Sequence, residues 1–443
     1  MLGAPAYASL ARSFGRQAPS ENRPPDVTLR ISPVELEVAP RKIVKTTGYN
    51  GSAPGPVLRM HEGQLITVNV INDTKIPELV HWHGQFLPSI VDGSEEEGTP
   101  MVPPGGSRVY SFVARPAGTR WYHAHGHAGR DLKRATYTGQ FGFLYVEPKD
   151  EPGRYDADIF LALHGWDPFL SAQGDEGNLE VTYPIYSINS HSLGFGDPIR
   201  VREGQKVLFR ILNASATEQH RIALAGHKFT VIQLDGNAVP VPREVEAIEM
   251  GPAERVDAVV TMNQPGVWIL GEADDEKRKA GLGIVVEYAN RSEAPQWMAP
   301  SATPWDYSIF ARDEVIPEPA GGVIPLVFRK KFAGNRWVDN WTINGKSFPK
   351  TDPIRVRANS RYRLRLDNRS DEAHPIHLHR HSFELTNLAG KAVSGVMKDV
   401  VVVPAMKQVD VDFLADNPGP TLFHCHQQMH MDYGFMALMQ YDA

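Results

Sequence analysis

The feature that most constrains the fold is an internal repeat. Tyr186-Ser-Ile-Asn precedes Asp197-Pro-Ile-Arg-Val-Arg202, and much later Trp341-Thr-Ile-Asn precedes Asp352-Pro-Ile-Arg-Val-Arg357. Each copy then runs through a strand-like segment ending in Asn and a histidine-bearing segment to a Phe, at positions 229 and 383. A weaker third copy starts at Gly48-Tyr-Asn-Gly51. One supersecondary unit, repeated three times, therefore fills most of the chain.

The local pattern inside the repeats is that of β-structure. Short apolar runs such as Leu65–Ile71 and Lys206–Leu212 alternate with Pro-Gly, Asp-Gly and Asn-Gly turn signals. Long stretches with helical periodicity are scarce, so we predict an all-β fold of sandwiches or barrels. The boundaries are expected near Pro148–Gly153 and between Ala294 and Pro319. The predicted divisions are an N-terminal tail (1–26) and units over 27–148, 149–293 and 294–443.

Composition excludes several classes of function. The net charge is −6 and no long basic run occurs, so neither nucleic acid nor an anionic membrane surface is an expected partner. No apolar stretch is long enough to span a bilayer. The tail over 1–26 has no apolar core of the kind that a signal peptide needs. It is either the remainder of a cleaved leader or a native disordered tail.

The only cysteine of the chain lies in the motif His424-Cys425-His426, with His430 shortly after it. Side chains alternate between the two faces of a strand, so His424 and His426 would point one way and Cys425 the other. One strand could therefore serve two metal sites. A thiolate combined with imidazoles suits copper, and a trigonal set of two His and one Cys is typical of blue-copper electron-transfer sites.

Three further windows are rich in histidine. A single His-x-His pair on a strand is equally compatible with zinc or with a purely structural role, but four windows in one chain favour a multi-metal site. The windows are His81-Trp-His83, His123-Ala-His125, His374-Pro-Ile-His377-Leu-His379, and the cysteine motif.

The repeats differ in these histidines. Counted back from the shared Phe, the middle copy has Ala223 and Ala225 where the last copy has His377 and His379, although His220 matches His374. Packing alone does not require this contrast. It predicts metal ligands in the outer units and a structural middle unit.

Face parity divides the ligands into two sets. His374 lies three residues before His377, so in a continuous strand it faces the other way and can join Cys425. His430 can close this set from beyond the strand. Eight imidazoles remain, which suits about three metal ions.

The four windows, in this order, resemble the copper motifs of three-domain, laccase-like multicopper oxidases, and the resemblance runs from about Val27 to the end. It implies three cupredoxin-like Greek-key domains of the β-barrel or sandwich type. It also implies four copper ions: one type 1 ion, one type 2 ion and a type 3 pair. By this resemblance the ligands are His374, Cys425 and His430 for type 1, His81 and His377 for type 2, and His83, His123, His125, His379, His424 and His426 for type 3.

The chemistry that the resemblance implies is stepwise. A small reducing substrate gives single electrons to the type 1 copper, and Cys425 passes them through the adjacent backbone to His424 and His426. Four electrons reduce dioxygen to water at the cluster. The resemblance also implies export, to the periplasm or the medium.

At two positions near the motif this chain departs from the pattern that is common in the family. The axial type 1 position of the family, often Met, is here Phe435, with Met436 beside it. Because the axial residue tunes blue copper, a residue that does not coordinate predicts a potential toward the high end for the family. The acid that bacterial relatives often carry after the last type 1 histidine is replaced by Met431, so proton supply is expected to be rearranged, with Asp432 as a candidate.

Acidic residues before the second window are the other candidates. Asp92 follows His81 at the spacing where relatives carry a proton donor, although Asp92-Gly93 also fits a simple turn. We predict the proton relay. Glu95-Glu96-Glu97 is predicted to be a solvated loop, with a role in shaping access to the cluster as the alternative.

Three functions compete. The favoured one is a laccase-like oxidase of phenols and aromatic amines. A metal oxidase acting on Cu(I) or Fe(II) is the alternative, weakened by the lack of a Met-rich insert between Val323 and Phe423. A copper-free structural relative is disfavoured because every ligand position is filled. The sequence does not specify the oligomeric state.

Overall fold

The computed structural model describes residues 24–150, 153–172, 179–332 and 338–442. Of the predicted tail, residues 1–23 lie outside the described residues, and the first strand begins at Val27. Nearly all regular structure is β-strand, which confirms the all-β prediction. Among the described residues, no helix combines the length and apolarity needed to cross a bilayer.

The strands fall into three groups that follow the sequence repeat. The first group comprises β1 (Val27–Ala39), β2 (Lys42–Tyr49), β3 (Leu58–His61), β4 (Leu65–Asn72), β5 (Val80–His81), β6 (Ser107–Val113), β7 (Gly118–Ala124) and β8 (Phe141–Glu147), with α1 (Ser89–Asp92) and η1 (Ala135–Tyr137). The middle group comprises β9 (Ala157–Trp166), β10 (Phe169–Ala172), β11 (Leu179–Thr182), β12 (Ile185–Ile188), β13 (Ile199–Val201), β14 (Lys206–Asn213), β15 (His220–Leu224), β16 (Phe229–Leu234), β17 (Asn237–Val245), β18 (Ala247–Met250), β19 (Arg255–Thr261), β20 (Val267–Glu272) and β21 (Gly283–Tyr288), with α2 (Asp275–Lys279). The last group comprises η2 (Tyr307–Phe310), β22 (Val323–Lys331), β23 (Asn340–Ile343), β24 (Ile354–Arg357), β25 (Arg361–Asn368), β26 (His374–Leu378), β27 (Phe383–Leu388), β28 (Lys391–Ala392), β29 (Met397–Lys398), β30 (Val400–Val403), β31 (Gln408–Leu414), β32 (Thr421–Cys425) and β33 (Met436–Asp442), with α3 (Gln428–Asp432).

The middle and last units have the same topology. In the middle unit a sheet of order β12-β9-β14-β19-β16-β17 accompanies a sheet of order β13-β21-β20-β15-β18. The last unit has β23-β22-β25-β31-β27-β28 and β24-β33-β32-β26-β30, and the first unit has the shorter sheets β2-β1-β4-β6 and β3-β8-β7-β5. All strands lie within the predicted ranges 27–148, 149–293 and 294–443. The division into domains at these boundaries stays a prediction.

Burial follows the strand period where a sheet has one wet face. Along β25, Tyr362, Leu364 and Leu366 point into the core, while the arginines between them face outward and pair with acidic residues of β31. In contrast, every residue of β32 is buried, because both faces of this strand are covered. A strand buried on both faces is the arrangement that two separate metal sites on one strand require.

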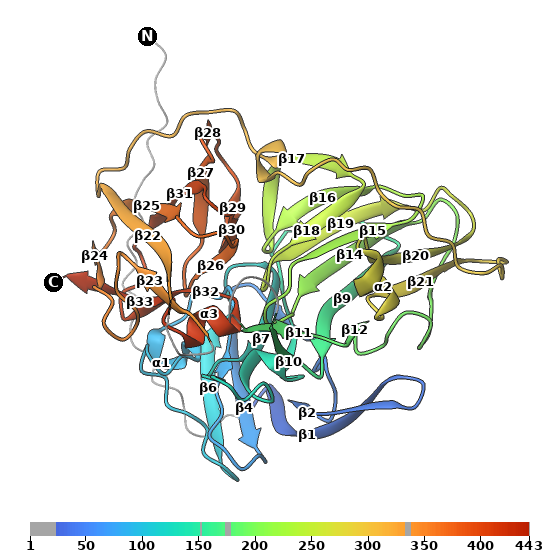
Figure 1. Ribbon diagram of the computed structural model, residues 1–443, viewed down its shortest axis with the longest axis horizontal. Helices are drawn as coiled ribbons and strands as arrows, with labels where there is room; N and C mark the ends of the chain where they lie inside the picture. Colours follow the sequence, from blue (N-terminus) through green and yellow to red (C-terminus); the bar gives the residue numbers. More distant parts are fainter. Residues whose placement is uncertain (1–23, 151–152, 173–178, 333–337, 443) are drawn as a thin grey trace.

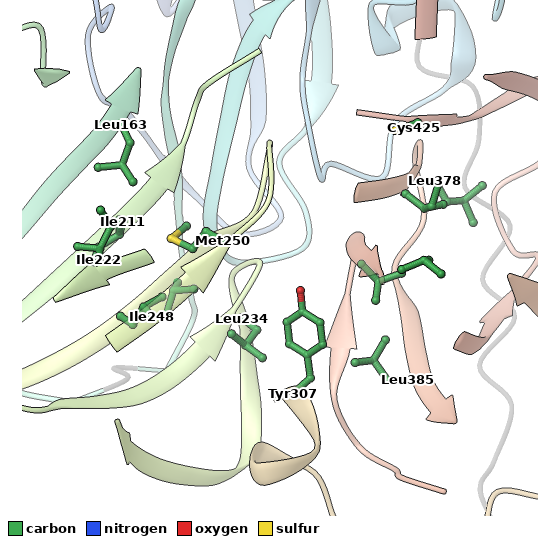
Figure 2. Close-up of a cluster of buried hydrophobic side chains, with 14 of the residues drawn as sticks. Leu163, Ile211, Ile222, Leu234, Ile248, Met250, Tyr307, Leu378, Leu385 and Cys425 are labelled. Carbon is green, nitrogen blue, oxygen red and sulfur yellow. The ribbon is translucent and has the colours of Figure 1, made fainter. Parts of the chain in front are cut away.

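The three units meet at one centre. A cluster of buried residues there includes Trp121 of the first unit, Leu212 of the middle unit and Val400 of the last. In Figure 1 the first unit lies below, the middle unit to the right and the last unit to the left, with β7, β32 and α3 near the middle. Figure 2 shows the core between the middle and last units, where Tyr307 stands between Leu234 and Leu385.

Candidate metal centre

The cysteine set comes from two neighbouring strands and one short helix of the last unit. β26 pairs antiparallel with β32, with Ile376 opposite Cys425 and His377 opposite His424. Because directly opposed residues point to the same face, Cys425 and His374 share one face of the sheet. β26 runs unbroken through Pro375, and α3, which follows β32, supplies His430.

The three donor atoms form a compact triangle. Nδ1 of His374 lies 3.2 Å from Nδ1 of His430, and Cys425 Sγ lies 3.8 Å from the first and 3.5 Å from the second. A point at the centre of this triangle is about 2 Å from each donor, close to the bond lengths that imidazole and thiolate make to a transition-metal ion. The donor set therefore fits one ion in trigonal coordination.

Outer partners hold both imidazoles of this set in one orientation. Nε2 of His374 lies 2.7 Å from Ser370 Oγ, and Nε2 of His430 lies 3.1 Å from a carboxylate oxygen of Glu372. Each Nε2–H can donate outward, which leaves the Nδ1 lone pairs directed at the thiol. A hydrogen bond on the far nitrogen is the usual way in which a protein orients a metal-binding imidazole.

The residues after α3 decide which side chain lies beside this set. The amide of Cys425 donates to the carbonyl of Phe435 (3.1 Å), and the ring of Phe435 lies 4.9 Å from that of His374. Met436 pairs with His424 and clusters with Leu422 and Met431 on the other side of the strand. Phe435, rather than Met436, is therefore next to the donor triangle, and its axial role stays a prediction.

The other eight predicted ligands gather where the first and last units face each other. Two ring pairs are stacked across the interface: His83 on His377 at 3.9 Å and His81 on His379 at 4.0 Å between centroids. Each of the two units contributes four side chains, from the ends of β5, β7, β26 and β32. The eight are His81, His83, His123, His125, His377, His379, His424 and His426, and all are buried.

The free nitrogens of this cluster indicate what it can hold. Six of the eight rings have a buried nitrogen with no hydrogen-bond partner: Nε2 of His81, His123, His125, His377 and His426, and Nδ1 of His83. The other two, His379 and His424, face each other through Nε2 atoms 3.1 Å apart. Unpartnered buried nitrogens are costly, and metal ions between the rings would satisfy all of them.

The cluster also divides into smaller groups. The donors of His125, His379 and His424 lie within 4.8 Å of one another. The rings of His83, His123 and His426 lie 5.1 to 5.6 Å apart. These are two sets of three, as the predicted type 3 pair needs. His81 also lies within reach of His83 and His123, so the assignment of single residues to single ions stays a prediction.

Burial sets the protonation of both groups. It lowers the pKa of His83, His377 and His426 well below the ordinary value, so these imidazoles are neutral and their lone pairs are available. It raises the pKa of the Cys425 thiol, because a bare thiolate is unfavourable in an apolar surrounding. A metal cation would supply the missing stabilisation, as copper–thiolate binding requires.

Two aspartates bind the histidines of both units together. The backbone carbonyl of Asp92 accepts from His81 Nδ1 (2.9 Å), and its carboxylate accepts from His379 Nδ1 (2.8 Å) in the last unit. The last unit repeats the device: the carbonyl of Asp399 accepts from His377 Nδ1 (2.7 Å), and its carboxylate lies 3.2 Å from His83 Nε2. This contact explains why His83 alone presents Nδ1 to the cluster.

Sequence reasoning missed Asp399 and its partners. Arg255 of the middle unit binds both carboxylate oxygens of Asp399 at 2.6 Å, and Arg120 of the first unit lies 3.2 Å from one of them. All three side chains are fully buried. The residues of this buried charge network are far apart in the chain, so no local sequence motif could have predicted it. Through it, all three units position the cluster.

The acidic loop after Asp92 differs from its prediction. Glu95 is exposed as expected, but Glu97 is buried, and the prediction of a solvated loop is wrong there. Glu97 accepts from the amide of Leu422 (2.6 Å), and burial together with the charge of Asp92 raises its pKa well above the ordinary value. Asp92 Oδ1 and Glu97 Oε2 each lack a donor, which a proton held by Glu97 between the two carboxyls would supply.

Met431 lies beside the cluster and contributes no polar group. Asp432 accepts from the amides of Ala128 and Gly129, and its other oxygen accepts from Gln428 (2.9 Å). His127 bridges Asp432 and Glu96, and the hydrogen bonds that it donates to both carboxylates raise the pKa of His127 to about 10. A buried carboxylate tied to the first unit thus lies next to position 431.

A cavity of about 230 Å³ lies beside the cysteine set, between the middle and last units. His430 and Trp341 line its floor. Its acidic side chains exceed its basic ones: Glu180, Glu218, Asp339 and Glu372 line it together with Lys330, which pairs with Asp339 and Glu372. The ring of His430 is the donor-set member nearest to solvent at this point.

Comparison with known proteins gives a consistent picture. Family models described as multicopper oxidase match residues 31–151, 185–288 and 326–443. Multicopper oxidase MmcO of Mycobacterium tuberculosis is 31% identical over 96% of this chain and 88% of its own length. Laccase-2 of Fomitopsis schrenkii is 27% identical over 90% of this chain and 87% of its own.

Solved structures show the same fold. The multi-copper oxidase from Pseudomonas thermotolerans superposes with a TM-score of 0.74 at 25% identity, covering 94% of this chain and 98% of the other. A multicopper oxidase from Campylobacter jejuni, described as a metallo-oxidase, gives 0.71 at 20% identity, covering 96% and 93%. Both laccases and metal oxidases are therefore among the proteins that this chain resembles.

Proposed function

Because the chain belongs to the multicopper oxidase family, an oxidoreductase family that uses dioxygen, we propose that it is a laccase-like enzyme. It oxidises phenols or aromatic amines one electron at a time and reduces dioxygen to water. The observation that carries this proposal is the single strand β32, whose Cys425 belongs to one donor set and whose neighbour His424 belongs to the other.

The proposed cofactor is four copper ions. We assign the type 1 ion to the cysteine set, and the trinuclear cluster to the eight histidines. Bound copper would accept single electrons at the first site and deliver four of them to dioxygen at the second. The proposed ligands are His374, Cys425 and His430 for type 1, His81 and His377 for type 2, and the remaining six cluster histidines for type 3.

The residues between the sites supply a short route. Cys425 is bonded through the backbone to both His424 and His426, and Nδ1 of His424 also lies 2.9 Å from the carbonyl oxygen of Cys425. This hydrogen bond gives a second connection beside the covalent one. The chain thereby joins the two donor sets without any solvent-filled gap.

Reduction of dioxygen to water also consumes four protons. We propose that Asp92 and Glu97 hold a proton next to the cluster, since these two buried carboxyls face each other and contact His379. Asp92 acts as the acceptor that orients the proton, and Glu97 as its neutral holder. Geometry favours this pair over Asp432, whose carboxylate is occupied by two amides and Gln428.

Substrate would enter the cavity beside His430. Its volume of about 230 Å³ and the ring of Trp341 suit a single-ring phenol or aromatic amine. Glu372, which bridges His430 and Lys330, could accept the proton that a phenol or amine loses on oxidation.

Oxygen uptake by copper-loaded protein tests the proposal. We expect turnover on 2,6-dimethoxyphenol, with four phenols oxidised for each dioxygen consumed and no hydrogen peroxide released. Replacing Glu372 with Gln should lower the rate with phenols more than with ferrocyanide, which loses no proton. Copper-loaded, blue protein that consumes no oxygen with any phenol or aromatic amine would contradict it.

A metal oxidase is the second candidate, because the same cavity is acidic. Glu180, Glu218 and Glu372 carry charges that favour a cation such as Fe(II) or Cu(I). If metal ions are the substrate, Glu180→Gln should raise the KM for Fe(II) or Cu(I) and leave the KM for a neutral phenol unchanged. We also propose export from the cytoplasm, which fractionation of cells that make the full-length protein would test.

A further inference from the structure

A second and larger cavity shares no lining residue with the one beside His430. Its volume is about 590 Å³, within the range of small-molecule sites. Three pieces of the chain enclose it: strand ends of the middle unit, the segment 305–307 that leads into the last unit, and β30 with the β27 end of the last unit. Neither His430 nor Glu372 lines it, so it is not part of the proposed substrate cavity.

One wall of this cavity is apolar and aromatic. Met250, Leu388 and Val402 line it together with Trp305 and Tyr307, and the Lys398 ammonium lies 5.0 Å from the ring centroid of Tyr307. The indole Nε1 of Trp305 is shielded from solvent and has no hydrogen-bond partner. An aromatic and apolar wall suits a flat organic body better than an inorganic ion.

The polar lining has an excess of negative charge. Five carboxylates line the cavity against two basic side chains. Three of the five have cationic or histidine partners: Glu249 with Arg221 (3.1 Å), Glu254 with Lys398 (3.0 Å) and Glu272 with His220 (3.0 Å). The second basic side chain, Lys277, pairs with Glu218, which does not line this cavity, and donates to the carbonyl of Gln219.

Two carboxylates remain at the rim. Asp274 accepts only from the amides of α2, and Asp306 only from the amide and hydroxyl of Ser308. Within the described part of the chain, neither has a basic partner. Both are exposed, so their charge is available to a ligand that enters from solvent.

We propose that this cavity binds a small organic cation with an aromatic body. The aromatic body would lie against Trp305, Tyr307 and the apolar wall, and the ammonium group would point to Asp274 and Asp306. Ring faces attract cations as well as apolar groups, so the same wall serves both ends of such a ligand. This site does not depend on copper or on the proposed oxidase activity.

Binding of 2-(4-fluorophenyl)ethylammonium to the copper-loaded protein, followed by fluorine NMR, tests the proposal. This probe carries no phenol or aniline, so it reports binding rather than oxidation. We expect saturable binding with a dissociation constant of about 1 mM, reasonable for a ligand of about ten heavy atoms. The matched alcohol and the matched carboxylate should bind at least about tenfold more weakly.

Two variants locate the site. Val402→Trp should fill the cavity and abolish binding, while Val315→Trp, at a position 79% exposed and outside the cavity, should not. The double variant Asp274→Asn, Asp306→Asn keeps both helix caps and should weaken binding of the cation several-fold. Asp275→Asn, next to the cavity but not lining it, is its control.

Each outcome decides the proposal. Cation binding that disappears in Val402→Trp and weakens in the double Asn variant supports it. If Val402→Trp does not fold, as judged by circular dichroism, the double Asn variant decides alone. Equal affinity for the ammonium, alcohol and carboxylate probes, or unchanged cation binding in folded variants, overturns it.

Discussion

The middle and last units place the same backbone around very different side chains. In the last unit the amide of Cys425 donates to the carbonyl of Phe435, and the amide of Phe435 donates to that of His430. In the middle unit the amide of Glu272 donates to Leu282, and that of Leu282 to Lys277. Strand register agrees, since Ile376 is opposite Cys425 and Ile222 is opposite Glu272.

Ion pairs occupy the middle unit where the last unit has its donor triangle. His220, the counterpart of His374, is 3.0 Å from Glu272, and Lys277, the counterpart of His430, pairs with Glu218. Even the supporting serine is kept, because Ser215 Oγ lies 2.8 Å from His220 Nε2. The fold around a cupredoxin-type site therefore does not depend on a metal. We therefore expect a few side chains on a common frame to decide whether a unit binds copper.

The other strand face shows the same contrast. Ala223 and Gly271 are paired in the middle unit where His377 and His424 are paired in the last. Asp399, which holds two cluster histidines, has Glu246 as its counterpart, since Val400 pairs with His377 and Ala247 with Ala223. Glu246 instead accepts from the amide of Ser301, at the surface. The middle unit thus contributes Arg255 to the network around the cluster, but none of the eight clustered histidines.

The largest expected effect comes from the cysteine. Cys425→Ser should abolish the blue absorption and lower oxidase turnover by more than about 1,000-fold, because a serine hydroxyl is neither soft nor readily deprotonated. Visible absorption and oxygen uptake of purified, folded protein measure this. Glu272→Gln, at the equivalent place in the middle unit, should leave both unchanged. A blue band retained in Cys425→Ser would show that Cys425 is not the side chain that distinguishes the last unit from the middle unit.

A smaller effect is expected at the carboxylate beside the cluster. Asp92→Asn should keep the blue band but slow turnover roughly 100-fold, since Asn cannot share a proton with Glu97. Stopped-flow reduction of the blue band should proceed at the normal rate, whereas its reoxidation by dioxygen slows. Glu246→Gln, which also neutralises one carboxylate but at the surface of the middle unit, is the control and should behave as the unchanged protein. Near-normal reoxidation in Asp92→Asn would count against the relay.

The middle unit should respond in stability rather than activity. Glu272→Ala leaves the buried His220 without its carboxylate and should destabilise the protein by about 3 kcal/mol. Thermal unfolding measures the loss, and the blue absorption per folded molecule should not change. The double variant His220→Leu, Glu272→Leu removes both partners and should cost less than the single change. Equal losses would show that the pair is not coupled.

The sequence was sufficient for those features that depend on periodicity. The alternation around Cys425 and the three-residue offset of His374 from His377 correspond to the two faces seen in β32 and β26, because both strands are regular. The sequence repeat aligned Ala223 and Ala225 with His377 and His379. It did not align Glu272 with Cys425, an equivalence that follows only from the strand register. The backbone hydrogen bonds were also needed to decide whether Phe435 or the next residue, Met436, lies beside the donor triangle.

Features that depend on contacts between units could not be predicted. Asp399, Arg255 and Arg120 are 135 or more positions apart in sequence, and ion pairs leave no periodic signal. Glu97 was misjudged for a related reason. Three consecutive glutamates suggest a solvent-exposed loop. The turn after α1 instead brings the third, Glu97, next to β32, where its carboxylate accepts a hydrogen bond from the amide of Leu422.

The smallest expected effect concerns the position beside the donor triangle. Phe435 is fully buried and offers no donor atom, whereas a methionine there would bring a thioether sulfur within reach of the copper. Phe435→Met should therefore lower the type 1 potential, measured by redox titration of the blue band, and slow phenol oxidation by less than about tenfold, because a shift of about 60 mV corresponds to a tenfold change in a one-electron equilibrium. Leu282→Met also introduces a methionine, at the equivalent buried position of the middle unit, and should leave the potential unchanged. An unchanged potential in Phe435→Met would mean that the added sulfur does not approach the copper, and that the common frame does not fix the axial position.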